Sequence, residues 1–304
     1  MHSSRPYPES GPSLSDVLPL LVVVNTPVIG EVMTHLSSHT CSSPFLKHFR
    51  SLYLASQCSG SIPAVFREIL TKSSVIAGFN SQVSSSESHI QSQDGNTNPE
   101  SLSAFFPFYR NHNTLSVNPQ EAYVWSSVID ATKTAMNIRY QLLPYMYTLF
   151  YLAHNTGSTV MRALAWEFPN DPSLAAADRQ FFLGPAILVI PVLDQGYDNV
   201  SGVFPGVGKG EVYYDWYNLS AVNAMPGDNI TIDAPLGHIP VYIRGKNIMP
   251  IQEPAMVTRD ARNNPWGLIA ALSLEGTASG SLYIDDGASL VQNATLYVEV
   301  SSHF

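Results

Sequence analysis

The sequence predicts an α/β plus β fold: the last part of a (β/α)8 barrel followed by one or more C-terminal β-sandwich domains. Three observations predict it. Residues 119–156 have apolar side chains at helical spacing, residues 159–166 form a compact apolar segment, and short strand-like segments with turn residues between them fill the rest of the chain. A helical region that leads into one buried strand and then into β structure is the arrangement expected at the end of such a barrel.

The helical segment begins just inside Pro119 and ends before Gly157. Pro144 lies within it and should kink or divide it, because proline removes a backbone donor and crowds the preceding turn. We therefore expect one kinked helix or two helices. The apolar positions that set the helical spacing are Tyr123, Val128, Met136, Tyr140, Leu143, Tyr147 and Phe150.

After Gly157 we expect residues 159–166 to form one buried strand, and residues 167–172 then give turn signals. Several short strands at such intervals favour a sandwich. The expected strands are residues 186–192, 210–217, 229–232, 239–244, 268–274 and 281–284.

Residues 1–103 have poor periodicity, and residues 81–103 are nearly free of large apolar side chains, which indicates a loop, a linker or damaged sequence. The sequence therefore suggests four parts. Residues 1–103 form a poorly patterned, divergent N-terminal segment, and residues 104–172 form the end of the barrel. Residues 173–260 form a proximal β-sandwich, and residues 261–304 begin a distal β domain.

Composition narrows the classes of partner. A net charge of -9 without any basic run argues against nucleic acid and against an anionic membrane surface. No stretch reaches the roughly eighteen apolar residues that a spanning helix needs, and residues 17–24 lack the flanks of a signal peptide. Cys41 and Cys58 allow at most one disulfide and do not make a zinc site by themselves.

One segment, Phe106-Pro-Phe-Tyr-Arg-Asn-His112, brings aromatic rings, a guanidinium and an imidazole together. Aromatic faces suit the apolar side of a pyranose, Arg110 offers a rigid set of donors, and His112 donates to or accepts from hydroxyls. The alternative is a buried aromatic cluster capped by a structural arginine. Spacing alone leaves the two interpretations open.

Other polar residues favour structural roles. Asp285 and Asp286 precede Gly287, which is the usual signal of a hairpin turn, and neighbouring strand residues point to opposite faces. Arg162 and Glu167 flank the barrel-end segment, where an ion pair between barrel and sandwich is at least as good an interpretation as a functional group. We expect His238 to be a structural histidine of the sandwich.

Ordered motifs along the chain then carry a resemblance. They are Phe105-Phe-Pro-Phe-Tyr-Arg-Asn-His-Asn113, Arg139-Tyr-Gln-Leu-Leu-Pro-Tyr-Met-Tyr-Thr148, Val160-Met-Arg-Ala163, Glu167-Phe-Pro169, Pro235-Leu-Gly-His-Ile-Pro-Val-Tyr-Ile-Arg-Gly245 and Tyr283-Ile-Asp-Asp-Gly287. From about residue 103 to about residue 290 the chain resembles the C-terminal part of glycoside hydrolase family 31, and the fungal secreted α-glucosidases most of all.

The resemblance implies a secreted, retaining α-glucosidase that removes terminal α-linked glucose from malto-oligosaccharides. It implies carbohydrate partners of the maltose type and no metal or organic cofactor, because the chemistry uses two carboxylates about 5 to 5.5 Å apart. It also implies that His112 contacts sugar hydroxyls, that Arg110 orients the loop, and that Phe79 is a candidate aromatic of the glucose subsite. Val75 and Ala77 stand where the family has Asp and Cys in the Phe79 segment.

The family carries its nucleophile in a Trp-x-Asp-Met strand end and its acid/base in a Gly-x-Trp-x-Gly-Asp loop, and the sequence contains neither. A complete barrel also needs roughly 250 residues. We therefore identify no catalytic residue and expect a truncated chain that is inactive by itself. If it is active, Glu121, Glu167 and Asp171 are the first residues to mutate.

Two alternatives stay open. One is a noncatalytic β-rich protein that binds carbohydrate or a protein partner. The other is a chain that does not fold stably, because a partial barrel leaves strand edges and apolar faces uncovered.

Four Asn-x-Ser/Thr triplets fit a glycosylated secretory protein. The candidate acceptors are Asn199, Asn218, Asn229 and Asn293.

Overall fold

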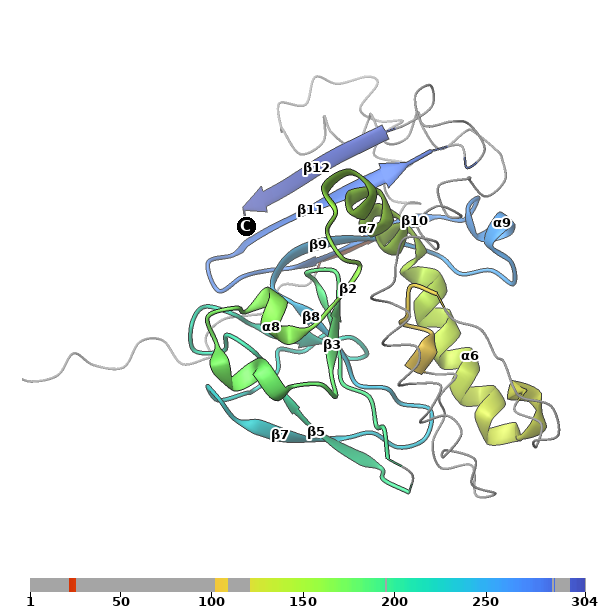
Figure 1. Ribbon diagram of the computed structural model, residues 1–304. Helices are drawn as coiled ribbons and strands as arrows, with labels where there is room; N and C mark the ends of the chain where they lie inside the picture. The colour runs from red at the N-terminus through yellow and green to blue at the C-terminus, as the bar shows by residue number, and fades with distance from the viewer. Residues whose placement is uncertain are drawn as a thin grey trace, which may run out of the picture.

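The computed structural model describes residues 22–25, 102–108, 121–194, 196–285, 287 and 296–303. Two helices, α6 (Ser126–Gln141) and α7 (Leu143–Thr156), run one after the other along the sheets of this part of the chain (Figure 1). None of the helices in these residues is long and apolar enough to cross a membrane.

The boundary between α6 and α7 confirms the division expected from Pro144. Leu142 has φ -83° and ψ -2° and separates the two helices, and Pro144 falls in the first turn of α7. A proline in the first turn costs no helical hydrogen bond, because that N–H would have no partner in the helix. Gly157, with φ 73°, ends α7, and its N–H donates to the carbonyl of Ala153.

The expected strand at residues 159–166 is wrong in its extent. Only β2 (Met161–Arg162) is extended there, and α8 (Leu164–Glu167) follows at once. Ala163 keeps the extended backbone that precedes the helix, with φ -68° and ψ 152°. Leu, Ala and Glu have high helix propensity, so the short apolar run turns into a helix after two strand residues. A 3-10 turn at Ala122–Val124 precedes α6, and a second one at Pro172–Ala176 follows α8.

The central sheet has the order β2-β3-β4-β8-β6, and all of its neighbours are antiparallel. Its members besides β2 are β3 (Phe181–Leu183), β4 (Ile187–Val189), β8 (Val241–Arg244) and β6 (Tyr213–Asp215). Along β4, Ile187 and Val189 enter one apolar cluster, whereas Leu188 and Ile190 enter another. The sheet is buried on both faces, which is why residues 186–192 are continuously apolar.

A second sheet has the order β1-β10-β9-β11-β12. Its strands are β1 (Val22–Asn25), β10 (Trp266–Ala271), β9 (Lys246–Gln252), β11 (Thr277–Ile284) and β12 (Leu296–His303). β9 and β10 pair directly, so this sheet crosses the expected boundary between residues 260 and 261. The position of that boundary stays a prediction.

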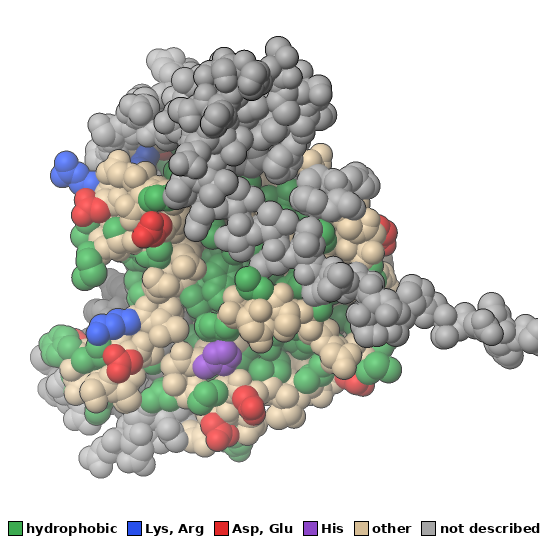
Figure 2. All heavy atoms as spheres, turned by 180° about the vertical axis from the view of Figure 1, so that it is seen from behind, with side chains coloured by type: hydrophobic (Ala, Val, Ile, Leu, Met, Phe, Trp, Pro, Cys, Tyr) green, Lys and Arg blue, Asp and Glu red, His purple; other side chains and the backbone are tan. Residues whose placement is uncertain are grey.

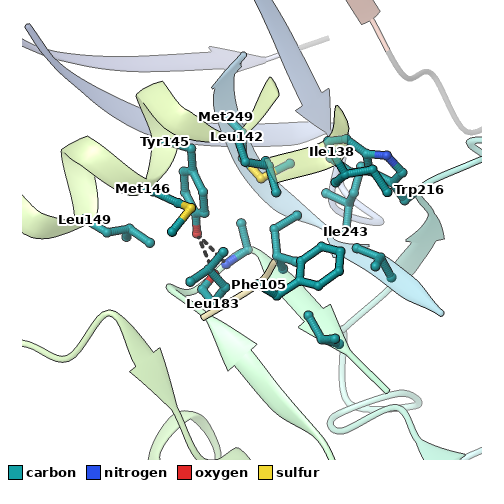
Figure 3. Close-up of a cluster of buried hydrophobic side chains, with 14 of the residues drawn as sticks. Phe105, Ile138, Leu142, Tyr145, Met146, Leu149, Leu183, Trp216, Ile243 and Met249 are labelled. Carbon is teal, nitrogen blue, oxygen red and sulfur yellow. Dashed lines mark hydrogen bonds between the residues drawn. The ribbon is translucent and has the colours of Figure 1, made fainter. Parts of the chain in front are cut away.

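The larger apolar cluster lies between these layers. Leu142, Tyr145 and Met146 from the helices meet Ile243 from the central sheet and Met249 from the second sheet (Figure 3). The cluster therefore joins the helical segment to the β structure in one continuous core.

A third sheet is a two-stranded ribbon of β5 (Asn199–Val203) and β7 (Asn229–Asp233). It lies at the opposite end of the view from β11 and β12 (Figure 1). On the face seen from behind, hydrophobic side chains gather in the middle of the described surface and charged ones are sparse (Figure 2). This agrees with a composition in which only 13% of residues are charged.

Candidate functional site

Phe79, Arg110 and His112, the three candidate sugar contacts, lie outside the described residues, as do Asp286 and Asn293. The structure does describe residues 102–108, which precede Arg110 and His112 in the sequence and form the lead-in segment.

This lead-in segment is anchored by two phenylalanines. Phe105 is 1% exposed and Phe106 is 3% exposed, and the Phe106 ring lies 5.8 Å from that of Phe181 at an angle of 57°. Phe108, two residues closer to the loop, is 40% exposed. Aromatic side chains of the motif therefore serve two purposes: Phe105 and Phe106 fill the core, and Phe108 reaches the surface.

Arg139 on α6 ties the lead-in segment to the helix. Its Nη1 donates to the carbonyl oxygens of Ala104 and Phe106, each at 2.7 Å. Two charge-assisted hydrogen bonds from one guanidinium thus satisfy two backbone carbonyls of the lead-in segment. The sequence patterns assigned no role to Arg139. The available signal was its spacing, because Arg139 lies four residues after the buried Ala135 and three before the buried Leu142.

Tyr145 ties α7 to the central sheet. Its hydroxyl donates to the carbonyl of Leu183 at 2.9 Å and accepts from the N–H of Ala186 at 3.2 Å (Figure 3). Burial raises the pKa of Tyr145 well above its ordinary value, so the group stays a neutral donor. A Cβ on Gly184, whose φ is 58°, would stand 2.3 Å from this hydroxyl, so glycine is required there.

Four charged side chains form a cluster where α8 meets the central sheet. Glu167 accepts from Arg162 Nη1 at 2.6 Å through Oε1 and from Arg244 Nη1 at 2.9 Å through Oε2. Arg244 also holds Glu211 with two bonds, Nε to Oε2 at 2.8 Å and Nη2 to Oε1 at 2.9 Å. The Phe168 ring lies 4.6 Å below the Arg244 guanidinium.

The ion pair expected of Arg162 and Glu167 is present, but it does not join barrel to sandwich, because Arg162 lies in β2, a strand of the same sheet as β8. Both oxygens of Glu167 and both oxygens of Glu211 accept hydrogen bonds from arginine, so each carboxylate is part of a structural ion pair. For Arg244, burial lowers the pKa, but the hydrogen bonds and charge of Glu211 outweigh it and the net shift is upward. The guanidinium therefore stays charged.

The other two carboxylates nominated for mutation are surface groups. Glu121 is exposed and precedes the 3-10 turn at Ala122–Val124 without a capping hydrogen bond. Asp171 caps the next 3-10 turn by accepting from the N–H and hydroxyl of Ser173, and this bonding lowers the pKa of Asp171. Its contacts are those of a cap.

Asp285 has the contacts of a turn and a tie between elements. Its Oδ1 accepts from the N–H of Gly287 at 2.9 Å, and its Oδ2 accepts from the hydroxyls of Tyr147 at 2.6 Å and Tyr283 at 2.9 Å. Tyr283 in turn stacks on Tyr151 of α7, with ring centroids 4.0 Å apart. The side chain therefore joins β11 to α7, which is a structural role.

His238 packs against the ring of Tyr217, with centroids 4.3 Å apart. The Tyr217 hydroxyl donates to the carbonyl of Ile239 at 2.9 Å. Burial lowers the pKa of His238, and the charge of Asp215 offsets this in part. These contacts fit the structural role expected for His238.

The described residues thus form two helices packed against a β domain, and the ion pairs lie within that domain, where β2 is an edge strand of the central sheet. Helices followed by antiparallel sheets are the arrangement expected where a (β/α)8 barrel ends and a β domain follows. Comparison with known proteins names the family.

The model of the glycosyl hydrolases family 31 TIM-barrel domain matches residues 71–149, and that of the glycosyl hydrolase family 31 C-terminal domain matches residues 157–249. The chain belongs to glycosyl hydrolase family 31. The expected fold, a partial barrel with a following β domain, is confirmed. The barrel match begins at residue 71, so it includes Phe79, which lies N-terminal to the motifs that first indicated the family.

Among curated proteins, the α-glucosidase of Aspergillus niger is 68% identical over 201 residues, which are 66% of this chain and 20% of that protein. Glucoamylase 1 of Schwanniomyces occidentalis is 56% identical over 200 residues, 66% of this chain and 21% of that protein. The chain spans about a fifth of the length of these relatives.

Among solved structures, the Tris-bound α subunit of glucosidase II matches with a TM-score of 0.61 and 27% identity, over 67% of this chain and 22% of that one. The glucose complex of the family 31 dextranase of Flavobacterium johnsoniae matches with a TM-score of 0.57 and 30% identity, over 62% of this chain and 23% of that one.

Proposed function

We propose that this chain carries part of the glucose subsite and the C-terminal β structure of a secreted α-glucosidase that releases terminal glucose from malto-oligosaccharides. The observation that carries the proposal is the pair of hydrogen bonds from Arg139 to the carbonyls of Ala104 and Phe106. They fix the backbone at residues 104–106, which precede Arg110 and His112 in the sequence. The identity of 68% to an α-glucosidase supports the same substrate class.

Within the proposal, His112 bonds to glucose hydroxyls, Arg110 orients the loop, and Phe79 lies against the apolar face of the sugar. A pre-formed loop binds sugar more tightly than a mobile one, because less conformational entropy is lost on binding. Arg139 is thus a positioning residue for this loop.

We propose further that the 304-residue chain, tested by itself, binds such sugars without hydrolysing them. Retaining hydrolysis needs a nucleophile and an acid/base carboxylate about 5 to 5.5 Å apart. Both family signatures are absent from the sequence. The two glutamates that meet in the described part of the structure, Glu167 and Glu211, are bound by arginine.

The test measures maltose binding by calorimetry and hydrolysis of a chromogenic α-glucoside by the same purified sample. We expect saturable binding, lost in His112→Ala and weakened in Arg139→Met. Lys133→Ala is the matched control, because Lys133 is an exposed residue of the same helix. Absence of maltose binding by the folded wild-type chain would refute the proposed subsite.

A noncatalytic carbohydrate-binding or partner-binding protein is the second candidate, and the absence of both catalytic signatures from the sequence favours it. Co-expression with the part of the Aspergillus niger α-glucosidase that precedes the matched residues separates the two. Hydrolysis that depends on both polypeptides and on His112 supports the α-glucosidase. Binding without restored hydrolysis supports the noncatalytic protein.

A further inference from the structure

The β5–β7 ribbon presents two Asn-x-Ser/Thr triplets on one exposed face. Asn199 pairs with Asp233, Ser201 pairs with Thr231, and Val203 pairs with Asn229. Asn199, Ser201, Asn229 and Thr231 are all exposed. The two triplets therefore run antiparallel beside each other, with their hydroxyl residues directly opposite.

Strand geometry explains why both ends of each triplet face outward. Side chains alternate between faces along a strand, so residues i and i+2 share a face and the residue between them points the other way. The middle residues, Val200 and Ile230, pack against the apolar cluster that contains Leu188 and Ile190. The asparagines are thus polar positions that the core does not use.

The outer edge of β5 is partly closed by a side chain. Gln180 donates to the carbonyl of Val203 at 2.8 Å and accepts from its N–H at 3.0 Å, in the manner of a neighbouring strand. In the residues that the structure describes, β5 and β7 pair with no strand but each other. An exposed two-stranded ribbon is prone to pairing with other chains unless something bulky or charged protects it.

A third triplet occupies a tight turn after β6. The Asp215 carboxylate accepts from the backbone N–H groups of Tyr217 and Asn218, each at 2.9 Å. Asn218 Oδ1 accepts from the N–H and the hydroxyl of Ser220, at 2.9 and 2.6 Å, and Leu219 between them has φ 63°. The turn engages the oxygen of the amide, and within the described residues Asn218 Nδ2 makes no hydrogen bond.

We propose that Asn199, Asn218 and Asn229 carry N-linked glycans, and that the glycans on Asn199 and Asn229 cover the outer face of the β5–β7 ribbon. In the reaction, Nδ2 of asparagine bonds to C1 of an oligosaccharide held on a lipid pyrophosphate. The bond from C1 to the phosphate oxygen breaks, the lipid pyrophosphate leaves, and Nδ2 loses one proton. The folded chain accommodates the products, since all three asparagines are exposed.

The proposed glycans lie on the β5–β7 ribbon and on the turn after β6, and not on the lead-in segment at residues 102–108. Glycans are bulky and solubilising, so they keep the ribbon from pairing with strand edges of other chains. The lead-in segment and helix α6 contain no Asn-x-Ser/Thr triplet.

The test expresses the 304-residue chain behind a heterologous secretory leader in a eukaryotic host. Peptides from the secreted protein are treated with peptide N-glycosidase in 18O-water, which converts a glycan-bearing asparagine to labelled aspartate. We expect label at Asn199, Asn218 and Asn229. Unlabelled, unmodified asparagine at these positions as the main species would overturn the proposal.

Paired variants keep the result independent of any folding defect. Asn229→Gln and Thr231→Ala each remove one glycan by different means, as do Asn199→Gln with Ser201→Ala and Asn218→Gln with Ser220→Ala. We expect the intact mass to fall by one glycan in both members of each pair. Asn223→Gln, at an exposed asparagine outside any triplet, leaves the mass of glycan unchanged. A pair whose members both keep the wild-type glycan mass would overturn that site.

Discussion

Arg244 Nη1 lies 2.9 Å from Glu167 Oε2, across 77 residues of sequence, and thereby joins β8 of the central sheet to α8. The same guanidinium donates two hydrogen bonds to the Glu211 carboxylate. The side chains of the three residues are only 16%, 14% and 12% exposed. The cluster therefore fastens α8 to the central sheet through a largely buried ion-pair network.

Replacement of Arg244 tests that network. Arg244→Met keeps most of the apolar stem but leaves Glu211 without its partner and Glu167 with one arginine. Removing one partner of a buried ion pair is strongly destabilising, so we expect a loss of about 3 kcal/mol in the free energy of unfolding, measured by urea denaturation. Arg179→Met is the control, because its ion pair with Asp194 is 54% and 62% exposed and should contribute under about 1 kcal/mol. Equal losses in the two variants would contradict the assignment.

Tyr145→Phe tests the tie between α7 and the central sheet. The variant leaves the carbonyl of Leu183 and the N–H of Ala186 without their buried partner, and we expect a cost of about 1–3 kcal/mol. Thermal and urea unfolding measure it. Tyr197→Phe serves as the control, since Tyr197 is 60% exposed, and it should leave stability unchanged. A neutral Tyr145→Phe would mean that these bonds contribute little.

The lowered pKa of His238 predicts that the stability of the fold depends on pH. Because burial lowers the pKa of His238 below 6.5, the unfolded chain binds a proton more readily than the folded chain. The contribution of His238 to stability is therefore present above pH 6.5 and is lost as the pH falls through the lowered folded pKa. Urea unfolding measured at about five pH values from 7.5 downward gives the free energy of unfolding. This free energy should decrease less in His238→Gln than in the wild type as the pH falls. Identical pH profiles would remove His238 as a cause.

Arg139→Met tests the positioning of the candidate glucose loop. Loss of both bonds to the lead-in carbonyls should weaken maltose binding about tenfold, or about 1.4 kcal/mol. Calorimetry measures this, with Lys133→Ala as the control on the exposed side of α6. Loss of stability with unchanged affinity would assign Arg139 a purely structural role.

A chain that folds stably should unfold in one cooperative transition. The larger apolar cluster combines side chains from α6, α7 and both five-stranded sheets, which favours a single transition for the described part of the chain. Differential scanning calorimetry of the wild-type monomer tests this expectation. A broad, non-cooperative loss of signal would favour the unstable alternative.

The sequence predicted what depends on local patterns. Pro144 divided the helix where expected, and the apolar run around Ile187 is a strand because both of its faces are buried. β9 escaped prediction because Pro250 lies within it and Lys246, with φ 70°, opens it in a backbone conformation that few residues adopt.

Local sequence patterns could not predict the contacts that support the candidate site. Arg139 lies 33 and 35 residues from the carbonyls it binds, and Arg244 lies 77 residues from Glu167. Each side chain could pair with many partners in an unfolded chain, and only the packing of α6 and of the central sheet selects these. The catalytic signatures, in contrast, are local motifs, and their absence is legible in the sequence itself.

The most direct test of the account measures maltose binding and chromogenic α-glucoside hydrolysis on one purified, folded sample of the chain, with and without His112→Ala. We expect saturable maltose binding that disappears in the variant, together with hydrolysis no greater than that of a buffer blank. Hydrolysis well above the blank that survives further purification would contradict it, because a carboxylate pair would then exist outside the family signatures.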